Sequence, residues 1–244
     1  MRILIDTHTH TLASGHAYNT IMEMARQAAD IGLPILGITE HAPAVPGTCP
    51  TSYFRNLKII PREMFGVRLL FGTEANIMDK EGNLDLKRDV LGQMDVVIAS
   101  AHTNCYADDR FNRDEVTGAY RSALANPYVN IIGHPDDGRF AIDYKELVKG
   151  AKEHNKLLEI NNASLLPSSS RKNARENDIE MLAYCREMSV PIIVNSDAHI
   201  HTRVGDFNAA LQLLKEIGFP GELVANYDAA LLAPILDHRK MEQK

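Results

Sequence analysis

Seven short apolar runs recur along the chain, each about as long as a β-strand and rich in Ile, Val or Leu. Strands of a parallel sheet have this nearly continuous apolar pattern when both faces of the sheet are buried. We therefore expect seven buried parallel strands, at residues 2–5, 34–38, 68–72, 95–100, 129–133, 156–160 and 191–195.

Amphipathic helical patterns lie between several of these runs. From residue 20 to 32, apolar side chains recur at helical spacing, Thr20 and Glu23 have the spacing of a capping box, and Gly32 can end the helix. Asp143 begins a second such segment, with Glu146 three residues later. We expect further helices at 177–188 and 206–217, and longer loops at 42–57, 75–88 and 161–176.

The alternation of strands and helices predicts βα units with right-handed crossovers. Two α/β architectures compete, an open doubly wound sheet and a closed barrel. Seven strands in 244 residues come close to the size of a barrel, in which about 250 residues carry eight strands. No GxGxxG motif follows the first apolar run, which weakens the case for an open nucleotide-binding sheet.

Composition and charge narrow the classes of function. The chain is 45% hydrophobic and 24% charged, as in ordinary globular proteins, and its net charge of −6 comes without Lys/Arg clusters, so we do not expect a nucleic-acid partner. No apolar run is long enough for a membrane span or a signal peptide. The three cysteines lie far apart, which is typical of reduced thiols, so we expect a cytoplasmic protein.

Each predicted strand is followed by a residue that can bind a metal ion. The carboxyl ends of the strands in an α/β fold share one face, where ligands and chemistry are found. In "DTHTH" the two histidines are two residues apart, so in a strand they would share a face about 6.5 Å apart. Seven of the ten histidines follow a predicted strand in this way: His8, His10, His16, His41, His102, His134 and His199.

This accumulation of ligand side chains predicts a metal centre. A catalytic zinc ion uses three protein ligands and keeps one position open, so seven imidazoles and two carboxylates are about the complement of three such ions. Mixed histidine and carboxylate ligands suit Zn, Mn or Fe, and no cluster of cysteines suggests a structural thiolate site.

The motifs "DTHTH", "ITEH", "GTEANI", "SAH", "GHP", "EINN" and "NSDAH" resemble, in order, those of the PHP (polymerase and histidinol phosphatase) family. "ASGHAYNT", "GTEANI" and "LEINNASLL" are similar to its YcdX-like phosphatase subgroup. The resemblance implies a single PHP domain over residues 1–244. It also implies a distorted seven-stranded (β/α)7 barrel, similar to a TIM barrel, with a trinuclear metal centre.

The resemblance also implies how three divalent ions, zinc first and Mn or Fe as alternatives, would share nine ligands. One ion would bind His8, His10, Glu74 and Asp197. Glu74 would bridge to a second ion, held also by His102 and His134. The third would bind His16, His41 and His199. Two departures from the family pattern are Glu40, where Asp is usual, and the acidic pair Asp136–Asp137.

Such a centre is strongly cationic and favours a phosphate dianion. We expect a phosphatase that cleaves phosphate monoesters by attack of a metal-bound hydroxide, with no protein nucleophile. Arg203 is a candidate phosphate contact. Arg171, Lys172 and Arg175 are further candidates, although for each of the four a solvated surface cation is the more common role. We expect Asp6 and Glu159 to orient histidines, and Asn161 and Asn162 to bond loop backbone.

Three other functions remain open from the sequence. A PHP-type phosphodiesterase or exonuclease would use similar metals but needs a basic groove for its substrate. A histidinol-phosphatase-like enzyme is a close relative. A non-enzymatic metal-binding module would fit if ligands were missing, and none of the nine is missing. The expected partner is a small phosphorylated substrate, and the sequence leaves a homo-oligomer open.

Overall fold

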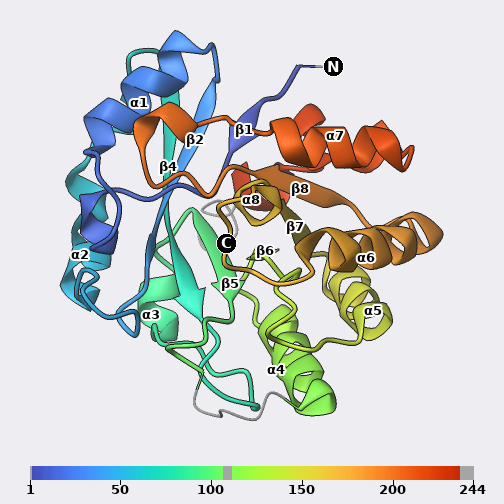
Figure 1. The fold of residues 1–244 in the computed structure, drawn as a ribbon. Helices are drawn as coiled ribbons and strands as arrows, with labels where there is room; N and C mark the ends of the chain where they lie inside the picture. Colours follow the sequence, from blue (N-terminus) through green and yellow to red (C-terminus); the bar gives the residue numbers. More distant parts are fainter. Residues whose placement is uncertain (1, 107–111, 237–244) are drawn as a thin grey trace.

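Parallel strands curve into a nearly closed barrel that helices surround on the outside (Figure 1). The computed structural model describes residues 2–106 and 112–236. The parallel strands pair in the order β1-β2-β4-β5-β6-β7-β8, and β3 pairs antiparallel with β4. Their bounds are β1 Ile5–Asp6, β2 Ile35–His41, β3 Glu63–Met64, β4 Val67–Asn76, β5 Val96–Ser100, β6 Ile131–Ile132, β7 Leu157–Asn161 and β8 Ile192–Asn195. The barrel and its seven predicted strands are confirmed, whereas the short β3 was not predicted.

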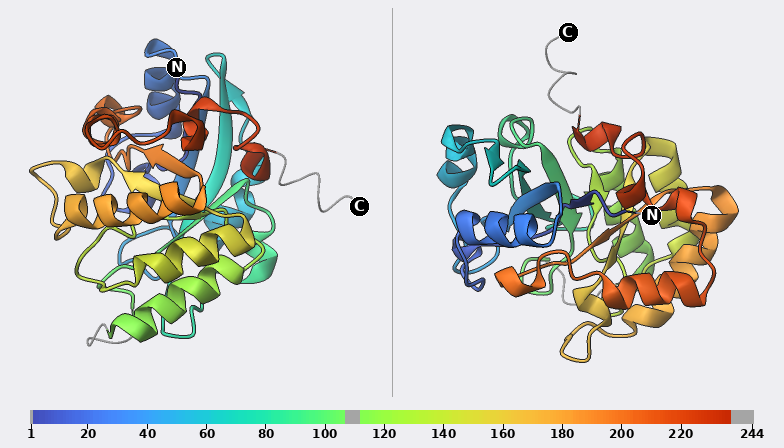
Figure 2. Two further views of the ribbon diagram at one scale, coloured as in Figure 1. Left: turned by 90° about the vertical axis from the view of Figure 1, so that its right-hand side faces the viewer. Right: turned by 90° about the horizontal axis from the view of Figure 1, so that it is seen from above.

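The helices lie outside the barrel, and α4, α5 and α6 lie side by side along it (Figure 2). They are α1 Ile21–Asp30, α2 Thr51–Asn56, α3 Arg88–Leu91, α4 Arg113–Ala125, α5 Tyr144–His154, α6 Ala174–Met188, α7 Asn208–Glu216 and α8 Ala233–Leu236. All four predicted helices are present, and the capping box of Thr20 and Glu23 is confirmed. The predicted loop at 42–57 contains α2, and neither the short α3 nor α4 was predicted.

The interior of the barrel is filled by side chains and closed at one end. A separate buried apolar cluster takes its members from six strands and from the end of the described chain. Leu232 and Ile235, in α8 and the turn before it, contact this cluster, so the C-terminal segment plugs the end of the barrel where the strands begin. The other end is left for polar side chains. The strand residues in the cluster are Ile5, Leu70, Val96, Ile98, Ile131, Leu157 and Ile193.

The side chain of Asn226 closes the seam between β1 and β8. The two strands do not pair as a ladder, apart from one parallel bridge beyond their ends, between Thr9 and Ala198. Asn226 Oδ1 accepts from the amide of Val194 at 2.8 Å, and its Nδ2 donates to the carbonyls of Ile5 and Val194. A buried amide thus replaces the missing ladder bonds.

Replacing Asn226 with alanine is therefore expected to destabilise the barrel. The change leaves one buried amide and two buried carbonyls short of a partner, at a cost of about 2–3 kcal/mol. Chemical denaturation followed by circular dichroism measures the change in the free energy of unfolding. Asn208→Ala, at an exposed position, is the control and should stay within about 0.5 kcal/mol of the wild type. Equal stability of the two variants would show that the seam does not depend on Asn226.

Strand length and register determine where the polar side chains lie. β2 and β4 are the longest strands, and their register places His41 beside Glu74, so both residues lie inside strands and not after them as predicted. The backbones of His134 and Asp197 adopt left-handed conformations, with φ of 28° and 54°, two residues after the ends of the shorter strands β6 and β8. Non-glycine residues rarely adopt this conformation, and it is often found at functional sites. In residues 2–106 and 112–236, no helix has the length and apolarity needed to cross a membrane.

Candidate metal centre

The nine predicted ligands lie together at the carboxyl ends of the strands. The parallel bridge between Thr9 and Ala198 aligns two segments that are distant in sequence. The residues that flank these two positions lie side by side, since His10 Nε2 is 3.3 Å from Asp197 Oδ1 and the rings of His10 and His199 are 4.4 Å apart. The bridge thus brings His8 and His10 beside Asp197 and His199. His41 and Glu74 come from β2 and β4, and His16, His102 and His134 from the segments after β1, β5 and β6.

Four of the ligand atoms form the first group. His8 Nε2 lies 3.4 Å from Glu74 Oε2 and 3.6 Å from Asp197 Oδ1. His10 Nε2 lies 3.6 Å and 3.3 Å from the same two oxygens. Ligands about 2.0–2.1 Å from one tetrahedral zinc ion lie about 3.3 Å from each other. These spacings therefore suit a common ion.

The two oxygens of Glu74 face different partners. Oε2 faces the first group, whereas Oε1 lies 3.3 Å from His102 Nε2 and 2.7 Å from His134 Nε2. A carboxylate divided in this way has the arrangement of a bridging ligand. His41 Nδ1 also lies 2.6 Å from Oε2, so this histidine contacts more than one group.

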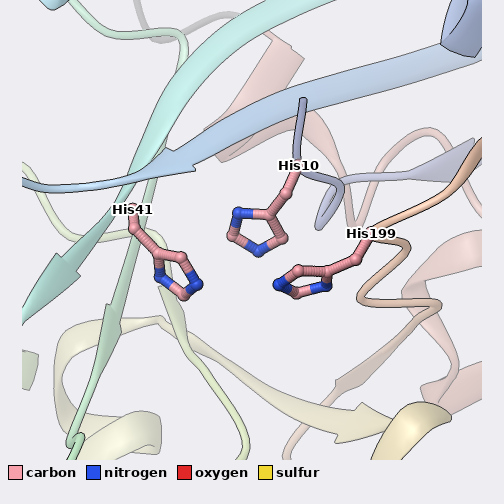
Figure 3. Close-up of side chains that lie close together, drawn as sticks. All are labelled: His10, His41 and His199. Carbon is pink, nitrogen blue, oxygen red and sulfur yellow. The ribbon is translucent and has the colours of Figure 1, made fainter. Parts of the chain in front are cut away.

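Three imidazoles meet at the outer edge of the cluster. His16 Nε2 lies 3.2 Å from His41 Nε2 and 3.1 Å from His199 Nε2. Figure 3 shows the rings of His41 and His199 turned toward one another, with His10 beside them. Three sets of side chains are compact enough to hold an ion. They are His10, His41 and His199; His8, His10 and Asp197; and His41, Glu74 and His102.

Two histidines of the first group are oriented by hydrogen bonds at Nδ1, His8 directly by a buried carboxylate and His10 through a serine hydroxyl. His8 Nδ1 lies 2.7 Å from Glu159 Oε1. Although burial opposes it, His8 lowers the pKa of Glu159, so this group is an acceptor and His8 Nδ1 carries the proton. Ser14 Oγ donates its one proton to Glu40 Oε2 and therefore accepts from His10 Nδ1 at 3.0 Å. In both histidines Nε2 is therefore the ring nitrogen that faces the cluster.

His102 and His199 are oriented in the same way by neutral acceptors. Asn76 donates its amide protons to Asp85 and Ala42, so its Oδ1 accepts from His102 Nδ1 at 2.7 Å. The carbonyl of Asp197 accepts from His199 Nδ1 at 3.0 Å. Metal-binding histidines are typically held like this, by a hydrogen bond from the other ring nitrogen.

Four buried atoms that face the centre make no well-aligned hydrogen bond, despite the close approach of His41 to Glu74: His8 Nε2, His10 Nε2, His41 Nδ1 and Glu74 Oε2. Buried polar atoms rarely lack a partner, because the loss of water is then uncompensated. A cation between them would satisfy the ring nitrogens that carry lone pairs and the free oxygen of Glu74 together. The residues present therefore fit a metal centre.

The centre is also electrostatically prepared for cations. Burial by itself would raise the pKa of Glu74 and of Asp197, but the facing histidines hold both pKa values well below the ordinary range. Burial, with the neighbouring His41 and His199, lowers the pKa of His10 and of His16. Both carboxylates are thus charged and both of these imidazoles are neutral at pH 7, as metal ligands must be.

The predicted supporting residues divide into correct and incorrect assignments. Glu159 orients His8, as predicted. The prediction for Asp6 is wrong: its carboxylate accepts from Ser196, from the amide of Gly205 and from the backbone amide of His8, and so orients backbone and not an imidazole. Asn161 accepts from the amide of Ser164 in the segment after β7, as predicted, whereas Asn162 accepts from the amide of Ala210 in helix α7 and not from loop backbone.

The two departures from the family pattern have different surroundings. Glu40 is fully buried and accepts from Thr11, Ser14 and Tyr53, which makes it the support of His10. Asp137 pairs with Arg139, which lowers the pKa of Asp137 against the effect of burial. The Asp136 carboxyl is buried, and burial raises its pKa to about 7.

The four candidate phosphate-binding cations lie in different environments. Arg203 ends a short 3-10 helix, is 54% exposed and pairs with Asp206, so contact with a substrate would require that pair to break. Lys172 is exposed, and Arg175 pairs with Glu216 at the surface. Arg171 differs, since its side chain is 15% exposed and donates to Asp197. The expectation that Arg171 is a solvated cation is wrong, and nothing in "SSSRKN" distinguishes it from its neighbour Lys172.

Comparison with known proteins gives the chain clear relatives. A family profile described as PHP domain matches residues 6–165. A protein of Thermoanaerobacter sp. strain X514, named a probable phosphatase, is 44% identical over 98% of this chain and 97% of its own. A probable phosphatase of Clostridium novyi is 42% identical over 97% and 95%. Histidinol phosphate phosphatase of Lactococcus lactis, solved with zinc, L-histidinol and phosphate, has a TM-score of 0.64 at 19% identity, over 89% of this chain and 94% of its own.

Proposed function

The chain belongs to the PHP domain family, and from this membership we propose that it is a metal-dependent phosphatase that hydrolyses phosphate monoesters at a centre of three divalent ions. The relatives named probable phosphatases match nearly the whole chain, which supports the reaction class. The single observation that carries the metal dependence is the orientation of His8, His10, His102 and His199, whose Nδ1 atoms are all occupied from outside.

The three groups of side chains suggest how the ions would be held. His8, His10, Asp197 and Glu74 Oε2 would hold the first. Glu74 Oε1, with His102 and His134, would hold the second. A third would bind His16, His41 and His199. We favour zinc because imidazole and carboxylate ligands at these spacings suit a tetrahedral ion, and Mn or Fe would accept the same ligands.

Bound divalent ions supply a water of lowered pKa and positive charge opposite the phosphoryl oxygens. The chain contributes the fixed orientation of the imidazoles through the hydrogen bonds at their Nδ1 atoms. Cys105, three residues after His102, is not suited to act as a nucleophile, because burial raises the pKa of its thiol to about 12. The hydrolysis we propose therefore needs no covalent intermediate with the chain.

Two measurements on the purified wild type test this function together. Metal analysis after reconstitution should find two to three divalent ions per chain. A generic aryl phosphate monoester should be hydrolysed, a chelator should abolish the activity, and a divalent metal should restore it. Preference for an aryl phosphodiester would instead favour the phosphodiesterase alternative. Metal binding without hydrolysis of either compound would favour the non-enzymatic module.

A further inference from the structure

Arg171 is a buried cation at the edge of the metal centre that the proposed reaction does not use. It lies in the loop between β7 and α6, and its guanidinium donates from Nη1 to Asn161 Oδ1 at 3.2 Å and to Ser164 Oγ at 2.9 Å. Its Nη2 donates to Asp197 Oδ2 at 3.1 Å. These three hydrogen bonds hold the Arg171 side chain in one conformation and offset the conformational entropy that it loses on burial.

The two oxygens of Asp197 have separate roles in this arrangement. Oδ2 accepts from Arg171 and, at 3.1 Å, from Asn161 Nδ2. Oδ1 is left facing His8 and His10. Without its two donors, the carboxylate could rotate about its terminal bond and exchange the oxygens, because this torsion is broad.

The backbone of Asp197 also needs support. Its φ of 54° lies in the left-handed region, which costs about 1–3 kcal/mol for a residue other than glycine unless the surroundings determine it. Arg171 and Asn161 hold the far side of the same side chain, and Asn161 Nδ2 also donates to Glu159, the support of His8. The loop after β7 is therefore connected to two of the ligands of one proposed ion.

We propose that Arg171 is a positioning residue that clamps Asp197 Oδ2, so that Oδ1 is presented to the ion shared by His8, His10 and Glu74. The inference rests on the proposed metal centre. A guanidinium suits this task because its planar fork donates along two edges at once, toward Asp197 from one nitrogen and toward Asn161 and Ser164 from the other. A lysine could keep the charge but not all three bonds.

The buried charges around Arg171 agree with this assignment. Asp136 and Glu74, besides Asp197, act on the guanidinium, and together they raise its pKa against the effect of burial. Asp178 lies next to Asp136, and burial with this neighbour raises the pKa of Asp178 well above its ordinary value. Arg171 thus carries its positive charge among buried acidic groups in the native protein, without needing a substrate phosphate to pair with.

The experiment compares metal retention in Arg171→Gln, Arg171→Lys and the control Arg175→Gln. Arg175 is the matched control, because it lies four residues away and pairs with Glu216 outside the centre. Each reconstituted protein is equilibrated with a graded series of a chelator, and the metal per chain is counted. We expect Arg171→Gln to release one ion at a chelator concentration about 10- to 100-fold lower than the wild type needs. Changes of residues that support metal ligands typically alter metal affinity by this factor. The chelator concentration that releases the ion from Arg171→Lys should lie between those for Arg171→Gln and the wild type, and that for Arg175→Gln should match the wild type.

Steady-state kinetics at limiting and then at saturating metal distinguishes positioning from direct phosphate binding. A clamp predicts a fall in kcat that added metal partly restores, with KM for an aryl phosphate little changed. A raised KM with wild-type metal retention would overturn the proposal in favour of phosphate contact, and unchanged retention and kinetics would overturn it as well. If Arg171→Gln does not fold, Ser164→Ala removes one anchor of Arg171 and should weaken retention a few-fold. A wild type without metal would refute the metal centre itself, which is a different result.

Discussion

Replacing Glu74 with glutamine is expected to remove metal and activity together. Glutamine has the same shape, but its amide group would place a donor against imidazole nitrogens or a cation where the carboxylate has an acceptor. Glu74 is buried and faces His8 and His10 with one oxygen and His102 and His134 with the other. Two of the proposed ions would therefore lose a ligand at once. We expect turnover to fall at least about 1,000-fold, or about 4 kcal/mol of transition-state stabilisation.

Metal counting and a phosphatase assay on the same preparation measure this effect. Glu40→Gln is the matched control, because Glu40 is an equally buried glutamate that supports His10 through Ser14. Residues in such supporting positions typically change metal affinity by about 10- to 100-fold, so this variant should regain activity at high metal concentration. Circular dichroism should show both variants folded. Normal turnover in Glu74→Gln would show that Glu74 does not bridge.

Replacing His16 with alanine is expected to remove about one ion per chain and to lower activity about 100-fold, or about 2.7 kcal/mol. His16 is exposed, lies in the loop after β1, and meets His41 and His199 at its Nε2. This proposed group has no carboxylate of its own, so it has the least negative charge to hold a cation. In the wild type, the same ion should be the first released by a chelator.

His201→Ala is the control for this change. His201 is close in sequence to His199, but its Nδ1 lies 3.1 Å from Asn19 Oδ1. This variant should keep its full metal content. Loss of all metal from His16→Ala would show that the three groups are not separable. Loss of none would show that His10, which also lies within reach of His41 and His199, takes the place of His16.

Much of the fold was predictable because it depends on local patterns. The seven apolar runs became the seven parallel strands, and the capping box of Thr20 and Glu23 begins α1 as predicted. The two-residue β3 is too short to produce a periodicity, whereas α4 was missed although its buried residues recur at helical spacing. The seam was not predictable, since nothing near Asn226 in the sequence indicates that its amide will join β1 to β8.

The same division holds for the candidate site. The sequence by itself determined which side chains gather at the barrel mouth, because parallel strands in βα units all end on one face. The tertiary structure decided which ligand meets which, through the register that places His41 beside Glu74 and the bridge that aligns His10 with His199. It also decided that Arg171 is buried against Asp197 while Arg175 is not. These contacts join residues distant in sequence, so they depend on the curvature of the whole barrel, which no local pattern contains.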